Sequence, residues 1–142
     1  MTSGSIKKNG RWYTAVTNAG DSRPWPLSVR ATDAKGQWAR PTKPVNAASN
    51  SAQGDLQAAG GEIWLIWQEH RLTTGRDLFA SAVRVRGITG RRDRGVQTLY
   101  RGTSGGPGRL RIVEARGRTW GMYLAGSKAD PALTELRITQ LR

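Results

Sequence analysis

One short stretch of the sequence combines residue types that suit the binding of a sugar. Asp21, Arg23 and Trp25 lie within five consecutive positions, so a carboxylate, a guanidinium and a flat aromatic ring can converge on one ligand. A sugar-binding surface needs such a ring together with several hydrogen-bonding groups. The alternative is structural, because Trp25 lies between Pro24 and Pro26 and can instead pack as a hydrophobic plug at the end of a sheet.

A second stretch suits an anionic ligand. Glu69, His70 and Arg71 are followed by Arg76 and Asp77, and the arginine side chain matches a carboxylate with two parallel hydrogen bonds. The alternative is an ion pair between Glu69 and one of the two arginines, screened by solvent and worth less than about 1 kcal/mol. We expect the single histidine to have no catalytic role.

Several kinds of site are excluded by composition. The sequence has no cysteine and one histidine, which rules out disulfides, cysteine-based metal sites and multi-histidine metal sites. We expect no metal site and no cofactor, and no motif in the sequence assigns a catalytic residue.

The chain is strongly basic. Its formal net charge is +13, with 23 lysines and arginines against 10 acidic residues. Such a surplus attracts polyanions of any kind, and the densest cluster, from Arg84 to Arg94, is the natural candidate for a nucleic-acid contact. Alternatively, the charges are spread over solvated strand faces and bind nothing specific.

Three tight turns organise the chain that must position these residues. The turns are Asn9-Gly10, Gly60-Gly61 and Arg116-Gly117, and a tryptophan follows each of them. Asn-Gly is a strong signal for a two-residue β-hairpin. The tryptophans at 12, 64 and 120 are separated by 52 and 56 positions, a period typical of four-stranded units arranged around an axis. We therefore align these three tryptophans as equivalent, and expect them and Trp67 to be buried.

Alternation of apolar and polar residues predicts strands and no helix. The expected strands are 3–8, 12–17, 26–31 and 42–46 in a first unit, 55–59, 64–68, 77–85 and 96–100 in a second, and 109–115, 120–125 and 132–139 in a third. The fold class is therefore all-β: a partial β-propeller of about three four-stranded antiparallel blades, the last without its outer strand. The units span residues 1–49, 50–104 and 105–142, and a sandwich or barrel is the alternative fold. Loops meet around the axis of a propeller, which adds Asp55, at the expected start of a strand, to the candidate ligand-binding residues.

The first unit contains a turn that resembles a family motif. The segment Thr32-Asp33-Ala34-Lys35-Gly36-Gln37-Trp38 resembles the Asp-box of sialidase-like β-propellers, with one extra residue between Asp and Gly. In such a turn the aspartate bonds to its own backbone, glycine supplies the positive φ and the tryptophan packs beneath. The turn at 87–90 in the second unit lacks both Asp and Trp, so the resemblance is one of pattern.

The resemblance implies a function in glycan recognition. Active members of that family grip the substrate carboxylate with three arginines and use a tyrosine nucleophile with a glutamate and an aspartic acid/base, but no catalytic residue can be carried over to this chain. The leading hypothesis is a glycan-binding or scaffolding propeller segment, part of a larger or oligomeric propeller. The alternatives are a nucleic-acid or polyanion-binding all-β protein and a fragment of an active glycoside hydrolase.

The expected partners follow from this fold. A homodimer can close a ring of six blades, and a glycan or another anionic ligand can bind at the axis. The longest apolar run, residues 63–67, is far shorter than the roughly 20 residues of a membrane helix, so we expect no membrane partner, and no signal peptide is visible in this chain. The compartment stays open.

Overall fold

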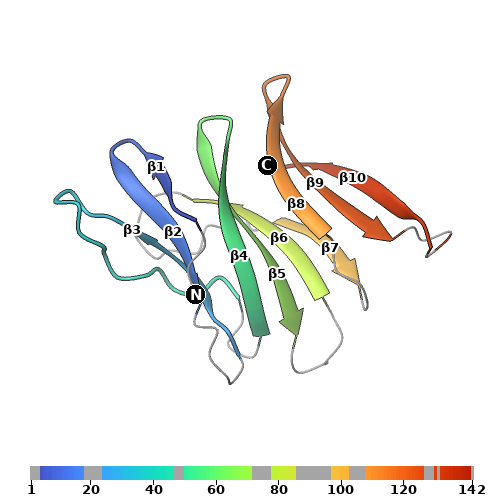
Figure 1. Cartoon of the computed structure of the whole chain (residues 1–142), viewed down its shortest axis with the longest axis horizontal. Helices are drawn as coiled ribbons and strands as arrows, with labels where there is room; N and C mark the ends of the chain where they lie inside the picture. Colours follow the sequence, from blue (N-terminus) through green and yellow to red (C-terminus); the bar gives the residue numbers. More distant parts are fainter. Residues whose placement is uncertain are drawn as a thin grey trace.

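β-strands are the only regular secondary structure in the part of the chain that the structure describes. The computed structural model describes residues 4–17, 24–46, 50–71, 78–85, 97–102, 108–126, 130 and 132–141. These residues form ten strands in three open antiparallel sheets and contain no helix (Figure 1). The predicted all-β class is therefore confirmed.

Each sheet is formed by one continuous stretch of chain. The first sheet contains β1 (Ile6–Lys8), β2 (Arg11–Thr17) and β3 (Leu27–Ala31). The middle sheet contains β4 (Asn50–Ala59), β5 (Glu62–Arg71), β6 (Leu78–Arg84) and β7 (Gln97–Gly102). The third sheet contains β8 (Gly108–Ala115), β9 (Arg118–Gly126) and β10 (Thr134–Gln140). The strands follow one another in chain order across every sheet, because each is joined to the next by an antiparallel connection.

The first hairpin of each sheet closes with the same kind of turn. Both central residues have positive φ in all three turns: 50° and 76° at Asn9-Gly10, 61° and 69° at Gly60-Gly61, and 53° and 71° at Arg116-Gly117. This is the type I′ geometry, which matches the twist of the flanking strands. The predicted hairpins are confirmed at all three places.

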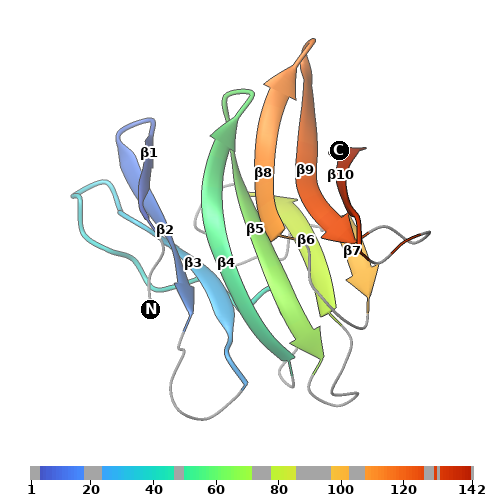
Figure 2. The same cartoon turned by 45° about the vertical axis from the view of Figure 1, so that its right-hand side comes forward.

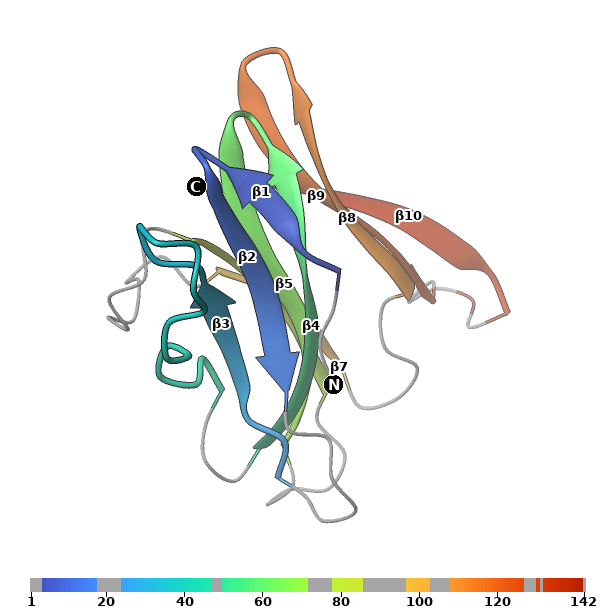
Figure 3. The same cartoon turned by 60° about the vertical axis from the view of Figure 1, so that its left-hand side comes forward.

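The three sheets pack face to face, with the middle sheet buried on both sides. One core lies between the first and middle sheets and contains Leu27, Leu65 and Trp67. The other core lies between the middle and third sheets and contains Trp64 and Tyr123. Successive residues of β5 therefore alternate between the two cores. Figure 2 shows the sheets side by side, and Figure 3 shows the first sheet in front of the middle one.

The hairpin register corrects the alignment of the tryptophans. Counted from the turn, Trp64 and Trp120 are the third residue of their strand, and the residue in that position of β2 is Tyr13. Trp12 lies one residue earlier. Because strand side chains alternate between faces, Trp12 points away from the middle sheet and is 44% exposed, whereas Trp64 is 1% exposed. The expected burial is thus right for Trp64 and Trp67 and wrong for Trp12. Trp120 has the same position after its turn as Trp64 but is only half-buried.

This register defines two faces of each sheet. We call the face that carries the third residue after the turn the leading face, and the opposite face the trailing face. The leading face of the first sheet packs on the trailing face of the middle sheet. The leading face of the middle sheet packs in turn on the trailing face of the third. Both contacts within the chain therefore have the same orientation.

The predicted fourth strand of the first sheet is not formed. Residues 42–46 run beside β3 without strand geometry. The Thr42 and Val45 N–H groups donate to the Val29 and Leu27 carbonyls at 2.8 and 2.9 Å, but a step of three residues against two breaks the register of a regular ladder. Side chains replace the missing acceptors: the Val29 N–H donates to Thr42 Oγ1 at 3.0 Å, and the Leu27 N–H donates to Asn46 Oδ1 at 2.9 Å. The outer edge of β3 is thereby closed by a covering segment rather than by a regular strand.

The turn at residues 32–38 has the expected backbone chemistry and an unexpected tryptophan position. Asp33 Oδ1 accepts the N–H groups of Lys35 and Gln37 at 2.8 and 2.9 Å, and Gly36 has a φ of 79°. Trp38, however, does not pack beneath the turn. Its ring is 42% exposed and lies 5.9 Å from the guanidinium carbon of Arg30, a cation–π contact.

Candidate functional site

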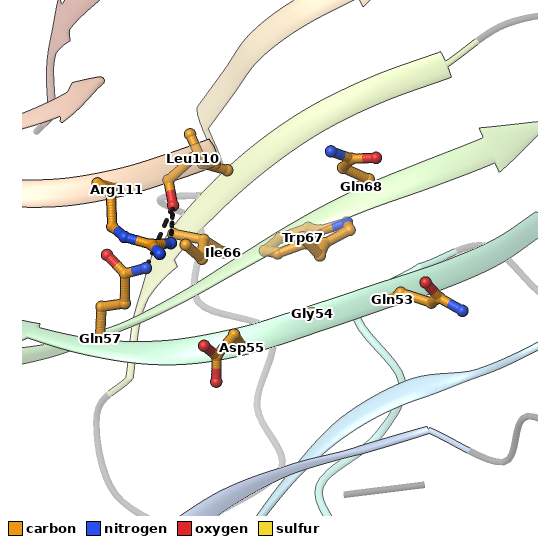
Figure 4. Close-up of a pocket in the computed structure, with 9 residues that line it drawn as sticks. All are labelled: Gln53, Gly54, Asp55, Gln57, Ile66, Trp67, Gln68, Leu110 and Arg111. Atoms are coloured by element: carbon orange, nitrogen blue, oxygen red, sulfur yellow. Dashed lines mark hydrogen bonds between the residues drawn. The ribbon is translucent and has the colours of Figure 1, made fainter. Parts of the chain in front are cut away.

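Two adjoining hollows lie along β4 and β5 and share two lining residues. The smaller has a volume of about 210 Å³ and is lined by Trp25, Ser51, Gln53, Gln68 and His70. The larger has a volume of about 310 Å³, and Figure 4 shows its lining: Gln53, Gly54, Asp55, Gln57, Ile66, Trp67, Gln68, Leu110 and Arg111. Because Gln53 and Gln68 belong to both, we treat the two hollows as one groove.

The register of β4 and β5 explains why the groove is polar at one end. Ser51 pairs with His70, and Gln53 pairs with Gln68, so these four side chains lie on the leading face of the middle sheet. Farther along the same face, Ile66 is buried against the third sheet. The leading face thus changes from an apolar half that the third sheet covers to a polar half that lines the smaller hollow.

The backbone of Trp25 is held against the free edge of β4. Its N–H donates to Ser51 Oγ at 3.2 Å, and its carbonyl accepts the Ala52 N–H at 3.0 Å. Asn46 Nδ2 donates to the same carbonyl at 3.1 Å and to the Asn50 carbonyl at 2.7 Å. Asn46 is only 4% exposed. This buried network fixes the main chain of Trp25, a half-buried residue that lines the smaller hollow.

The larger hollow contains a carboxylate and a guanidinium. Asp55 is exposed on β4 and its Oδ1 accepts the Leu56 N–H at 2.8 Å. Arg111 comes from β8 of the third sheet, where its Nη1 donates to the Leu110 carbonyl at 3.1 Å. The smaller hollow, in contrast, has only neutral amide and hydroxyl groups, an imidazole and an indole in its lining.

Gln57 joins the two sheets at the end of the groove. Its Nε2 donates to the Leu110 carbonyl at 3.2 Å, and its Oε1 accepts the Ile112 N–H at 2.7 Å. In Figure 4 the side chains of Gln57 and Arg111 both point to that carbonyl. One glutamine amide therefore acts as a short substitute for strand pairing between β4 and β8.

The structure brings together some of the sequence-derived candidates. Trp25 lies in the smaller hollow and Asp55 in the larger one. Asp55 is in the middle of β4 rather than at a strand start, because this strand begins at Asn50. His70, expected in a loop, is in β5 and lines the smaller hollow.

Glu69 has structural partners on the opposite face of β5 from His70. Its Oε1 accepts the Asn50 Nδ2 donor at 2.6 Å, and its Oε2 accepts the Trp67 Nε1 donor at 3.1 Å. The carboxylate thus ties β4 to a tryptophan of the core. Arg71 is the last residue of β5 and pairs with Asn50 in register.

The remaining candidates lie outside the described residues. These are Asp21, Arg23, Arg76 and Asp77, together with most of the cluster from Arg84 to Arg94. Among the described residues, no three His, Asp or Glu side chains are grouped so that they could hold a metal ion. No helix in the described ranges is long and apolar enough to cross a membrane.

Sequence reasoning missed Gln53, Gln57, Gln68 and Arg111 as lining residues. A signal was present, since polar residues alternate along β4 at 51, 53, 55 and 57. Whether these polar residues line a groove depended on which sheet covers that face of β4, and this is a long-range property.

A scan against protein-family models found no match to this chain, and neither a search of curated proteins nor a search of solved structures returned one.

Proposed function

We propose that the chain is a segment of a sialidase-like β-propeller and that the groove along β4 and β5 binds a carbohydrate. Three consecutive sheets that each begin with a type I′ hairpin and pack in the same orientation support the propeller. The observation that carries the binding proposal is the composition of the smaller hollow, in which one indole lies beside two amides and a hydroxyl.

The chemistry of a sugar fits this lining. A pyranose ring presents an apolar C–H face, which an indole can cover, and an edge of hydroxyl groups that both donate and accept hydrogen bonds. Glutamine amides also do both, so Gln53 and Gln68 can pair with neighbouring hydroxyls. Trp25 is already half-buried and its backbone is fixed. Binding of a sugar therefore costs little conformational entropy of this residue.

Two features favour binding over the alternatives. Asp55 is the only carboxylate among the described residues that line the groove, and no tyrosine lines it, whereas active members of the sialidase-like family use a tyrosine nucleophile with a glutamate and an aspartic acid/base. The groove also pairs one carboxylate with one guanidinium, so its lining lacks the excess of positive charge that a polyanion site needs.

The experiment is a titration of the purified protein with a panel of neutral and acidic oligosaccharides, followed by tryptophan fluorescence and calorimetry. We expect Trp25→Ala to weaken binding at least about 10-fold, equivalent to about 1.4 kcal/mol, while Trp38→Ala, which removes an exposed tryptophan elsewhere, has no effect. Gln68→Ala provides a second variant that leaves every aromatic ring in place.

Salt separates the proposal from polyanion binding. Sugar affinity should change little between about 50 and 200 mM salt, whereas a contact with several phosphates loses orders of magnitude over that range. Binding of a single-stranded oligonucleotide with a steep salt dependence and no response to Trp25→Ala would replace the carbohydrate proposal. Hydrolysis of a chromogenic sialoside by the protein would support the hydrolase alternative instead.

A further inference from the structure

The large exposed apolar side chains lie on or beside the two end sheets. Among the described residues they are Trp12 and Trp38 in the first unit and Leu133, Leu136 and Ile138 in the third, each between 42% and 58% exposed. Strands β4 and β5 of the middle sheet contribute none to this set, because a neighbouring sheet covers each of their faces. Exposed apolar patches of this kind mark surfaces for association.

The exposed face of the third sheet resembles a face that is buried elsewhere in the same chain. Leu136 pairs with Leu124, and Ile138 pairs with Met122, so four aliphatic side chains share this leading face. Met122 occupies the same position after its turn as Ile66 does in the middle sheet. Ile66 is 4% exposed because the third sheet covers it. The leading face of the third sheet thus has the side chains of a contact between sheets.

The outward face of the first sheet is a trailing face, the kind of face on which a leading face packs elsewhere in the chain. The exposed Trp12 and the half-buried Val16 lie on its trailing face, next to the polar side chains of Lys7, Thr14, Ser28 and Arg30. Trp12 and Val16 occupy the positions of Ile63 and Trp67 in the middle sheet. Those two residues are buried against a leading face. The Lys7 ammonium lies 5.7 Å from the centre of the Trp12 ring, a cation–π contact on the same face.

We propose that two copies of the chain associate head to tail, with the leading face of the third sheet of each copy packed on the trailing face of the first sheet of the other. Both contacts within the chain join a leading face to a trailing face. Two copies make two such contacts, each between the leading face of one copy and the trailing face of the other. Two is the smallest number of copies that covers both exposed faces in a closed arrangement. This inference rests on the sheet faces and is independent of carbohydrate binding.

The test is the solution mass by size-exclusion chromatography with light scattering. We expect about twice the chain mass of 15.5 kDa. Trp12→Lys and Ile138→Lys should each raise the dissociation constant of the dimer at least about 10-fold, whereas Ala58→Lys, which adds the same charge to an exposed position of the middle sheet, should leave it unchanged. Circular dichroism melting of each variant checks that it folds, and Leu136→Thr provides a milder change on the same face.

A mixing experiment tests the orientation. Trp12→Lys keeps its third sheet intact and Ile138→Lys keeps its first sheet intact, so an equimolar mixture should form a mixed dimer through one unaltered contact. A monomeric parent protein would overturn the proposal. So would a dimer that survives Trp12→Lys, because it would show that the third sheet packs on its own copy, and so would a monomer that needs an oligonucleotide to associate.

Discussion

The two contacts of the middle sheet are made in different ways. Against the first sheet, β4 has Gly54 where Leu27 arrives: a Cβ atom at Gly54 would lie 2.7 Å from Leu27 Cδ2 and 2.8 Å from the Ile66 carbonyl oxygen. Thr17 Oγ1 donates to the Ala52 carbonyl at 3.2 Å across the same contact. Against the third sheet, Gln57 bridges two backbone groups of β8, and Tyr123 packs edge-on to Tyr100 with 6.1 Å between ring centres.

The difference shows how the groove is built. The first contact brings main chains close together, which places the backbone of Trp25 on the edge of β4. In the second contact the side chain of Gln57 spans from β4 to the backbone of β8, and the larger hollow lies beside it. One wall of the groove therefore depends on the absence of a side chain at Gly54. The other wall depends on the long side chain of Gln57.

Breaking the first contact should have the largest effect. Gly54→Ala places a methyl group against Leu27 and against a backbone carbonyl that cannot move aside, so we expect a loss of about 1–3 kcal/mol in the free energy of unfolding. Urea denaturation measures it. Gly126→Ala is the matched control, since nothing lies within 4 Å of a Cβ atom there. An equal response of the two variants would contradict the close approach.

Breaking the second contact should cost less. Gln57→Ala removes both hydrogen bonds to β8, and we expect a loss of about 1–2 kcal/mol in the free energy of unfolding, because β8 is an edge strand and its freed groups can reach water. Gln37→Ala, at an exposed turn position, serves as control. An unchanged free energy of unfolding in Gln57→Ala would show that the two bonds to β8 contribute nothing to stability.

A change outside both contacts should have the smallest effect and the opposite sign. Arg116 has a φ of 53° in the third hairpin turn, a conformation in which asparagine is preferred. Arg116→Asn should therefore raise the free energy of unfolding by about 0.5 kcal/mol, measured by thermal and urea denaturation. The reciprocal change Asn9→Arg should lower it by a similar amount, and stabilisation by both changes would show that the turn does not set the preference.

Features with local causes could be read from the sequence. The three hairpin turns need only two residues that tolerate positive φ, and the Asp33 turn closes on its own backbone. Most strands follow from local alternation, although β4 and β5 extend beyond their expected ends because residues 50–54 pair with residues 67–71. Trp25 and Asp55 could be named as candidates from residue type alone.

Features with long-range causes could not be predicted from the sequence. The sequence around Trp12 resembles that around Trp64, and one residue of register sends the two rings to opposite faces. Residues 42–46 are predicted as a strand, but they bond to β3 out of regular register, and the side chains of Thr42 and Asn46 accept two of its N–H groups. Gln53 and Gln68 line a groove only because the third sheet covers the apolar half of their face and not the polar half.

By itself, the sequence determined the all-β class, the three type I′ hairpins and the turn at Asp33, because each depends on backbone preferences and hydrogen bonds within a few residues. The tertiary structure alone decided which tryptophans are buried, how closely each pair of sheets approaches and which polar side chains share the groove. These properties depend on contacts between residues far apart in the chain, such as Leu27 against Gly54 and Gln57 against β8, and no local pattern specifies such contacts.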